Sequence, residues 1–229
     1  MASIAHNRMR TVRIAFALLL LLMAFLASNA HARAEDGSPQ ACRVIVVGYV
    51  GGLDTPGNPG SGIVRIRDRL RGLNHGDLCV RTFSAYTWWH GYNWARSKFP
   101  AGEERKLTSE ELSLAPKVVI YGRSFGGWAS LSLSRRLQEN NIPVELTVQI
   151  DSVGLTDKTL PPNVKESANY DRRAILPPYG KTKIHAGDPD KTQMLPSVRV
   201  HANHIAVARA PNISDLVVGK VVALYEAPE

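Results

Sequence analysis

Residues 117–137 read KVVIYGRSFGGWASLSLSRRL, and this stretch decides the fold. The apolar run over 117–121 predicts a buried strand, and the residues from 129 onward have the composition of a helix. Between them lies a Gly-x-Ser-x-Gly pattern formed by Gly122, Ser124 and Gly126. This pattern between a strand and a helix predicts a nucleophile elbow. The alternative interpretation is an ordinary glycine-rich turn.

An elbow of this kind explains the residue types. The turn is so tight that side chains two residues before or after the serine would collide, so both positions are glycine. The strained backbone exposes the serine hydroxyl, and the first N–H groups of the helix point at the atom it attacks. Ser124 is therefore the candidate nucleophile.

Residues 1–34 have the pattern of a secretory signal peptide. Three arginines among residues 8–13 precede an unbroken apolar run over 14–27, and Ala-Arg-Ala at 32–34 is a small-x-small cleavage sequence. The run is shorter than the roughly 20 residues that a membrane span needs, which favours a cleaved signal peptide. An uncleaved anchor is the alternative. We expect a secreted or periplasmic domain over 35–229, without stable membrane insertion after cleavage.

The charge of the chain gives no sign of a nucleic-acid partner. Four of the 28 basic residues and none of the 20 acidic ones lie in residues 1–34, so the remaining chain has a net charge of about +4. No run of Lys and Arg is longer than two residues. The length of the remaining chain suits one domain with a sizeable core.

Strands and helices alternate along the chain. The predicted strands cover 43–50, 79–84, 117–121 and 144–150, with weaker candidates at 182–185 and 198–201. The predicted helices lie near 63–70, at 110–114, from the elbow to about 140, and from 211 onward. This alternation predicts a single-domain α/β fold, a mostly parallel sheet flanked by helices in three layers. The proline-rich segment 160–179 is expected to be irregular, either a cap over the site or a long connection.

Cys42 and Cys79 each open one of the first two predicted strands. Adjacent parallel strands would bring them within reach of a disulfide, and an oxidising compartment favours one. The alternative is two buried, inert thiols. Neither cysteine has metal-ligand spacing, so no metal is predicted. The glycines at 48–52 match neither nucleotide-binding motif, so no cofactor is expected.

The elbow motif at 122–127, with a late His204 ahead of a final helix, resembles the α/β-hydrolase superfamily. Within it, the chain looks most like the small secreted lipase and esterase branches. The resemblance extends from about Cys42 onward and rests on this one motif plus the order of elements. It implies the chain order serine, acid, histidine. Five histidines lie outside residues 1–34: His75, His90, His185, His201 and His204. His75 and His90 precede Ser124. His185 lies within a predicted strand and His201 ends another, so His204 is the candidate base.

Two aspartates are candidates for the acid that orients this base. Asp151 directly follows the strand predicted over 144–150, at the carboxyl edge of the sheet where catalytic groups gather. Asp188 follows the next strand candidate and is the alternative acid. A structural role for Asp151, as a helix or turn cap, is also open.

The resemblance also implies an oxyanion hole made of backbone N–H groups. The first donor is Phe125, the residue after the nucleophile, and the second is Val50 or Gly51. A flexible crossover is the alternative role for that glycine-rich loop. Tyr86, Trp88 and Trp89 belong to an aromatic cluster that suits an acyl or aromatic ester group, a loop packed on the sheet, or a carbohydrate platform.

The expected function is a secreted serine hydrolase that cleaves carboxylic esters through an acyl-enzyme on Ser124. The expected partner is a small-molecule or lipid ester, and the sequence does not indicate an oligomeric state. A thioesterase or amidase would use the same triad. A non-catalytic binding domain that keeps the hydrolase fold is the alternative from another class of proteins.

Overall fold

The computed structural model describes residues 41–99, 105–153, 158–172 and 183–227. The predicted signal peptide over 1–34 lies outside the described residues. Among the described helices, none combines the length and the apolar character that crossing a membrane requires.

The core of the fold is a sheet of seven strands in the order β2-β1-β3-β4-β6, with β8 and β9 both paired to β6. Every pairing in this sheet is parallel. A separate two-stranded sheet pairs β5 with β7. The strands are β1 Val44–Val50, β2 Leu78–Ser84, β3 Lys117–Arg123, β4 Leu146–Ile150, β5 Thr159–Leu160, β6 Glu166–Arg172, β7 His185–Ala186, β8 Gln193–Met194 and β9 Val198–Val200.

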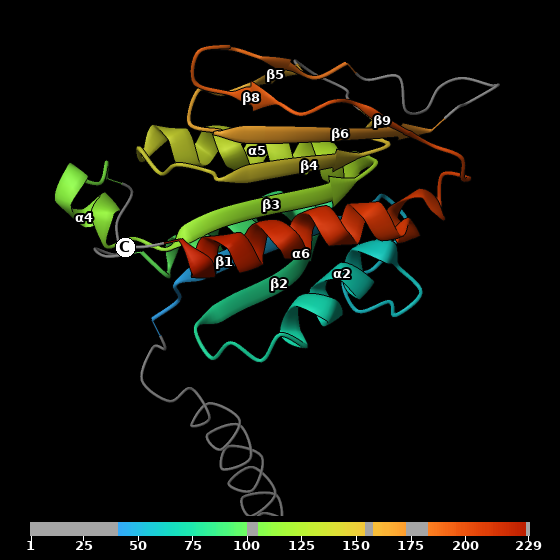
Figure 1. Cartoon of the computed structure of the whole chain (residues 1–229), viewed down its shortest axis with the longest axis horizontal. Helices are drawn as coiled ribbons and strands as arrows, with labels where there is room; N and C mark the ends of the chain where they lie inside the picture. Colours follow the sequence, from blue (N-terminus) through green and yellow to red (C-terminus); the bar gives the residue numbers. More distant parts are fainter. Residues whose placement is uncertain (1–40, 100–104, 154–157, 173–182, 228–229) are drawn as a thin grey trace, which may run out of the picture. The chain divides into compact units, whose positions relative to one another are not determined.

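Helices cover both faces of this sheet, so the predicted three-layer α/β fold is confirmed (Figure 1). Side chains at alternate positions of a strand point to opposite faces. Accordingly, Ile45 and Val47 of β1 pack in the core on the α3 and α5 side, whereas Val44 and Val46 pack on the α2 and α6 side. The helical elements are α2 Gly62–Arg71, η1 Ala85–Thr87, α3 Trp88–Arg96, α4 Ser109–Ser113, α5 Phe125–Glu139, η2 Val207–Arg209 and α6 Pro211–Glu226.

Strand β6 corrects the expectation that the segment from residue 160 is irregular. Its sequence, ESANYDR, lacks an apolar run, yet it pairs with β4 in the middle of the sheet. Its buried Ser167 is satisfied by neighbours on β4: Thr147 Oγ1 donates to Ser167 Oγ, which donates to Gln149 Oε1, both at 3.1 Å. Ala168 and Tyr170 of β6 pack in the core on the α2 and α6 side, whereas Ser167 points to the other face and is hydrogen-bonded, so the strand has no continuous apolar run. The rest of the segment, 173–179, lies outside the described residues.

The aromatic cluster, the end of β3 and the strand at residue 185 also differ from expectation. The aromatic cluster forms the short helices η1 and α3 instead of a loop, and the Ser84 hydroxyl caps the start by accepting from the Tyr86 N–H at 3.3 Å. Strand β3 extends to Arg123, two residues farther than predicted, and therefore leads directly into Ser124. Residue 185 does lie in a strand, but that strand belongs to the small second sheet.

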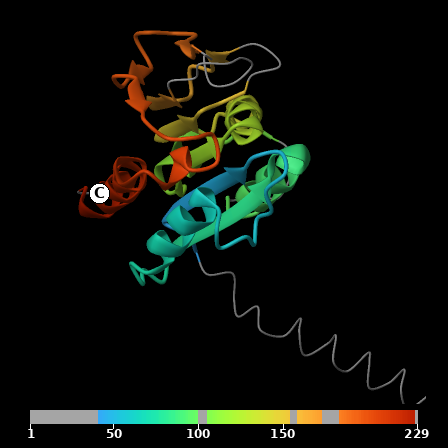
Figure 2. The same ribbon diagram turned by 90° about the vertical axis from the view of Figure 1, so that its right-hand side faces the viewer.

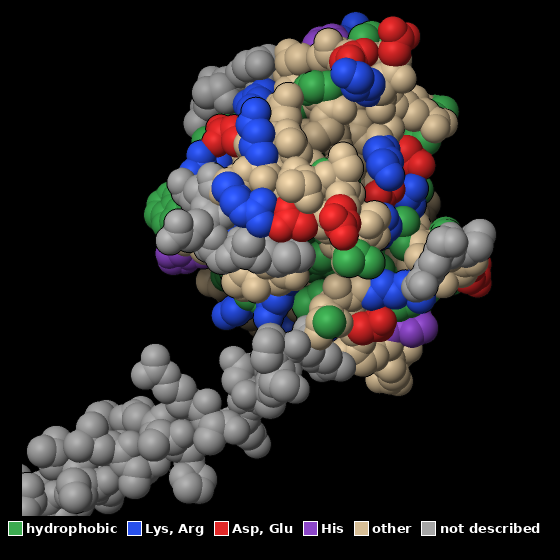
Figure 3. Space-filling model, turned by 90° about the vertical axis from the view of Figure 1, so that its left-hand side faces the viewer, with side chains coloured by type: hydrophobic (Ala, Val, Ile, Leu, Met, Phe, Trp, Pro, Cys, Tyr) green, Lys and Arg blue, Asp and Glu red, His purple; other side chains and the backbone are tan. Residues whose placement is uncertain are grey.

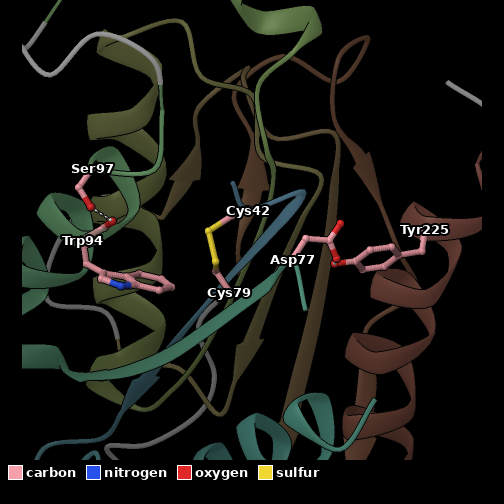
Figure 4. The surroundings of a disulfide bond; sticks show 6 residues. All are labelled: Cys42, Asp77, Cys79, Trp94, Ser97 and Tyr225. Carbon is pink, nitrogen blue, oxygen red and sulfur yellow. Dashed lines mark hydrogen bonds between the residues drawn. A yellow bond between two sulfur atoms is a disulfide. The ribbon is translucent and has the colours of Figure 1, made fainter. Parts of the chain in front are cut away.

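The predicted disulfide between Cys42 and Cys79 is present, with the two Cα atoms 5.7 Å apart (Figure 4). It lies where β1 and β2 begin. At the same edge the Tyr225 hydroxyl, near the end of α6, donates to the Asp77 carboxylate at 2.9 Å. Burial is the main cause of a raised pKa for Tyr225, and this hydrogen bond raises the pKa further. These contacts tie both ends of the described fold together at the amino edge of the sheet, opposite the edge where β1, β3 and β4 end.

The surface on the left-hand side of Figure 1 carries both signs of charge. Figure 3 shows Lys and Arg side chains interspersed with Asp and Glu on this face. Charges of opposite sign at this spacing largely cancel beyond a Debye length. This face therefore presents no extended field of one sign.

The disulfide is expected to stabilise the fold without affecting turnover. It closes a loop with a sequence separation of 37, which in the loop-entropy model contributes about 3 to 4 kcal/mol. Denaturant unfolding with and without a reductant should show a loss of this size, while the activity of the folded protein is unchanged. Thiol titration of denatured, unreduced protein is the direct check, and two free thiols would contradict the bridge.

Candidate active site

Ser124 occupies a strained turn between β3 and α5. Its backbone has φ 58° and ψ −124°, outside the regions that L-residues normally adopt. A Cβ on Gly122 would lie 2.1 Å from the Gly126 carbonyl oxygen, and one on Gly126 would lie 2.2 Å from the Tyr49 carbonyl oxygen. Both glycines are therefore required by close backbone approach, as the elbow interpretation of the sequence predicts.

Hydrogen bonds fix this elbow to the end of β4. The Ser124 N–H donates to the Ile150 carbonyl at 3.0 Å, and the Val153 N–H donates to the Ser124 carbonyl at 3.1 Å. A Cβ on Gly127 would lie 2.3 Å from Ser152 Oγ, so the elbow helix and the segment after β4 are in close contact. The position of Ser124 is thus coupled to that of the neighbouring Asp151.

Asp151 is fully buried at the end of β4 and also has a positive φ, 44°. Its Oδ2 lies 2.5 Å from Nδ1 of His204 and accepts a hydrogen bond from Arg172 Nε at 2.8 Å. Its backbone N–H donates to the Tyr170 carbonyl at 2.6 Å. Strand β6, which carries Tyr170 and Arg172, therefore holds both the backbone and the carboxylate of Asp151.

His204 lies in the segment between β9 and η2, and its side chain is 29% exposed. Because Nδ1 faces Asp151, Nε2 is the ring nitrogen that a role in proton transfer would use. His204 and Ser124 line the same cavity, of about 440 Å³. Figure 2 faces the edge of the sheet at which β1, β3 and β4 end. Ser124 follows β3 and Asp151 follows β4 at this edge, and the His204 ring contacts Asp151.

Asp188, the alternative acid, lies elsewhere. It is in the turn before β8, which pairs with the first residues of β6, at the amino edge of the sheet. Its Oδ1 accepts from the Asp190 N–H at 3.2 Å, and its Oδ2 forms an ion pair with Lys191 at 3.2 Å. These contacts are those of a turn-capping aspartate.

The cavity beside Ser124 has an apolar rim. Leu53, Tyr86 and Ile205 line it, and all three are exposed to solvent. Of the predicted substrate-binding aromatic residues, only Tyr86 is among its lining residues. Trp88 packs partly buried against the core, and Trp89 stands half-exposed on α3. The lining consists of Gly52, Leu53, Asp54, Asn58, Gly60, Ser61, Tyr86, Arg123, Ser124, Phe125, His204, Ile205 and Arg209.

The predicted oxyanion donors lie around the elbow. Phe125 is the first residue of α5, so its N–H belongs to the free end of a helix. A Cβ on Gly51 would lie 3.2 Å from Ser124 Cβ. Val50, in contrast, is the last residue of β1 and pairs with Ser84 in the sheet. Of the two candidates for the second donor, Gly51 is the one just beyond the strand.

Sequence reasoning missed two arginines at this edge, Arg172 and Arg123. Arg172 belongs to the strand that was not predicted. Arg123 stands directly before the nucleophile, and a charged residue at the end of an apolar strand was the available signal. Burial lowers the pKa of the Arg123 guanidinium, and the nearby Asp54 carboxylate opposes this shift. Across the described ranges, no group of three or more His, Cys, Asp or Glu residues is arranged to hold a metal.

No family model matches the chain, and no curated protein matches it in sequence. Among similar solved structures is one described as a hydrolase of the alpha/beta superfamily, from Xanthomonas campestris pv. campestris. It is 10% identical, with a TM-score of 0.47, over 79% of this chain and 99% of that one. The NocB thioesterase domain from the nocardicin cluster is 13% identical, with a TM-score of 0.43, over 82% and 96%. An arylesterase is 12% identical, with a TM-score of 0.43, over 82% and 77%. All three TM-scores are below 0.5, so the functional argument rests on the geometry of the site.

Proposed function

We propose that this protein is a secreted serine hydrolase that cleaves carboxylic esters. One observation carries the proposal. A strained serine at a strand-to-helix elbow shares a cavity with a histidine whose Nδ1 lies 2.5 Å from a buried aspartate. This combination supports an activated nucleophile, in which a base accepts the proton and a third group orients the base.

The proposed reaction proceeds through an acyl-enzyme. Ser124 Oγ attacks the ester carbonyl carbon while Nε2 of His204 accepts the hydroxyl proton, and the same proton then goes to the leaving alcohol. Asp151 keeps the imidazole oriented and stabilises its positive charge. Water, activated by His204, then releases the acid.

The oxyanion of the tetrahedral intermediate needs donors that are already in place. The N–H of Phe125 and the N–H of Gly51, or of Val50, are proposed for this role. Each donor of this type contributes roughly 100- to 1000-fold to the rate.

The apolar rim supports an ester with an apolar acyl or aromatic group. Leu53, Tyr86 and Ile205 expose apolar surface around the cavity, and burying that surface against a substrate is favourable by about 25 cal/mol per Å². The cavity of about 440 Å³ lies within the range of small-molecule sites.

A panel of p-nitrophenyl esters of increasing chain length, run beside a matched thioester and anilide, tests the proposal. Turnover of the esters, together with labelling of the protein by a fluorophosphonate, is the expected result. Faster turnover of the thioester or anilide would assign the same triad to another leaving group. Absence of both turnover and labelling would favour the alternative, a non-catalytic binding domain with the hydrolase fold. Export itself is checked by N-terminal sequencing, with Glu35 expected as the first residue.

A further inference from the structure

Arg123 is a buried cation beside the nucleophile, and it joins two loops. Its side chain is 8% exposed. Nη1 donates to the His204 carbonyl at 3.0 Å, with the Ile205 carbonyl at 3.5 Å, and Nη2 forms an ion pair with Asp54 Oδ2 at 3.2 Å. One guanidinium thus contacts the loop that carries the proposed base and the loop that follows β1.

The Asp54 end of this bridge organises the loop of the proposed second oxyanion donor. The Asp54 N–H donates to the Gly51 carbonyl at 3.0 Å. Its Oδ1 accepts from the Thr55 N–H at 3.0 Å and from Asn58 Nδ2 at 2.8 Å. A Cβ on Gly51 would lie 3.3 Å from Arg123 Nη2, so the guanidinium also packs against the loop backbone. A shift of Arg123 would therefore move Gly51 relative to Ser124.

At the other end, Arg123 holds the backbone of the proposed base. The His204 ring is oriented by Asp151 through Nδ1, whereas its carbonyl is held by Arg123. Asn203 Oδ1 accepts from the N–H groups of Ile205 and Ala206, which makes this loop a compact turn. Two independent attachments, one on the ring and one on the backbone, thus fix His204.

The bridge is a costly way to stabilise a fold. Removing a guanidinium from water is unfavourable unless all of its donors are paired, and Arg123 Nε is buried with no partner among the described residues. A planar fork that reaches a carboxylate and a carbonyl at once is a property of arginine that lysine lacks. Positioning, more than stability, accounts for an arginine here.

We propose that Arg123 is a positioning residue that holds the His204 loop and the Gly51 loop in register around Ser124. This inference rests on the proposed function, because it concerns the geometry of that reaction. Displacement of a reacting group by about 1 Å can cost about 100-fold in rate. Arg123 acts on kcat through the base and the oxyanion donor.

The test compares Arg123→Lys with Arg96→Lys. Arg96 is a matched control because it is an arginine with the same burial, 6% exposed over the whole residue, and it is not among the residues that line the cavity. Arg123→Lys keeps a cation for Asp54 but cannot reach Asp54 and His204 together. We expect kcat to fall about tenfold or more, with KM and the melting temperature close to wild type. Arg96→Lys should keep the wild-type kcat.

Three results would decide against the inference. An Arg123→Lys protein with wild-type kcat overturns it, and so does a loss of activity that parallels the unfolded fraction. If Arg123→Lys does not fold, Asp54→Asn replaces it, because it keeps the loop hydrogen bonds and removes the ion pair; a wild-type kcat for that variant also overturns the inference. Fluorophosphonate labelling of the wild type separates the two proposals, since an unlabelled, inactive wild type overturns the function itself.

Discussion

Replacing Ser124 with alanine is expected to abolish ester turnover and leave the fold intact. Loss of the nucleophile costs roughly 10⁶-fold in kcat in subtilisin, which uses the chemistry proposed for Ser124. The backbone at this position is equally strained with serine and with alanine, so the melting temperature should change little. Assays with a short p-nitrophenyl ester, together with circular dichroism melting, measure the two quantities separately.

Ser132→Ala is the matched control for this experiment. Ser132 lies on the same helix, α5, and its hydroxyl only donates within the helix, to the Trp128 carbonyl at 3.1 Å. It should keep both turnover and fluorophosphonate labelling, while Ser124→Ala loses both. If Ser124→Ala retains wild-type turnover, the nucleophile has been assigned to the wrong residue.

Asp151→Asn is expected to lower kcat at least about 100-fold, and up to about 10⁴-fold as in chymotrypsin-type enzymes. The carboxylate accepts from His204 Nδ1, and an amide favours the wrong tautomer of the ring. Stability should also fall, by about 1 to 3 kcal/mol, because Arg172 loses its charged partner. Rates must therefore be measured well below the melting temperature.

Asp188→Asn is the control for Asp151→Asn. Asp188 caps a turn at the opposite edge of the sheet, so its replacement should leave kcat near the wild-type value. A large loss of rate in Asp188→Asn with little loss in Asp151→Asn would reverse the assignment of the acid. If neither variant loses activity, the acid proposal fails for both residues.

The sequence was sufficient for the elements whose signals are local. The elbow could be predicted because its glycines answer a steric requirement within seven residues of chain. Asp151 and His204 could be proposed because the end of a strand and the start of the last helix are visible in the apolar pattern, and because the resemblance to α/β hydrolases implies the chain order serine, acid, histidine. The disulfide followed from two cysteines at the start of neighbouring strands.

The contacts that were missed depend on partners far away in sequence. Strand β6 buries Ala168 and Tyr170 on one face and hydrogen-bonds Ser167 to β4 on the other, so its apolar alternation is too short to mark it as a strand. Arg172 therefore could not be placed beside Asp151. The role of Arg123 required knowing that the His204 carbonyl and Asp54 meet at one point. Composition alone also could not show that Trp88 packs against the core while Tyr86 faces the cavity.

The backbone strain at Ser124 lowers the stability of any form of this protein that keeps a serine there. A non-glycine residue with such dihedral angles costs on the order of 1 to 3 kcal/mol, and glycine would relieve most of this cost. Natural and engineered proteins commonly trade stability for activity in this way. A laboratory selection for thermal stability alone would therefore favour glycine at position 124. The selected protein would be more stable but inactive.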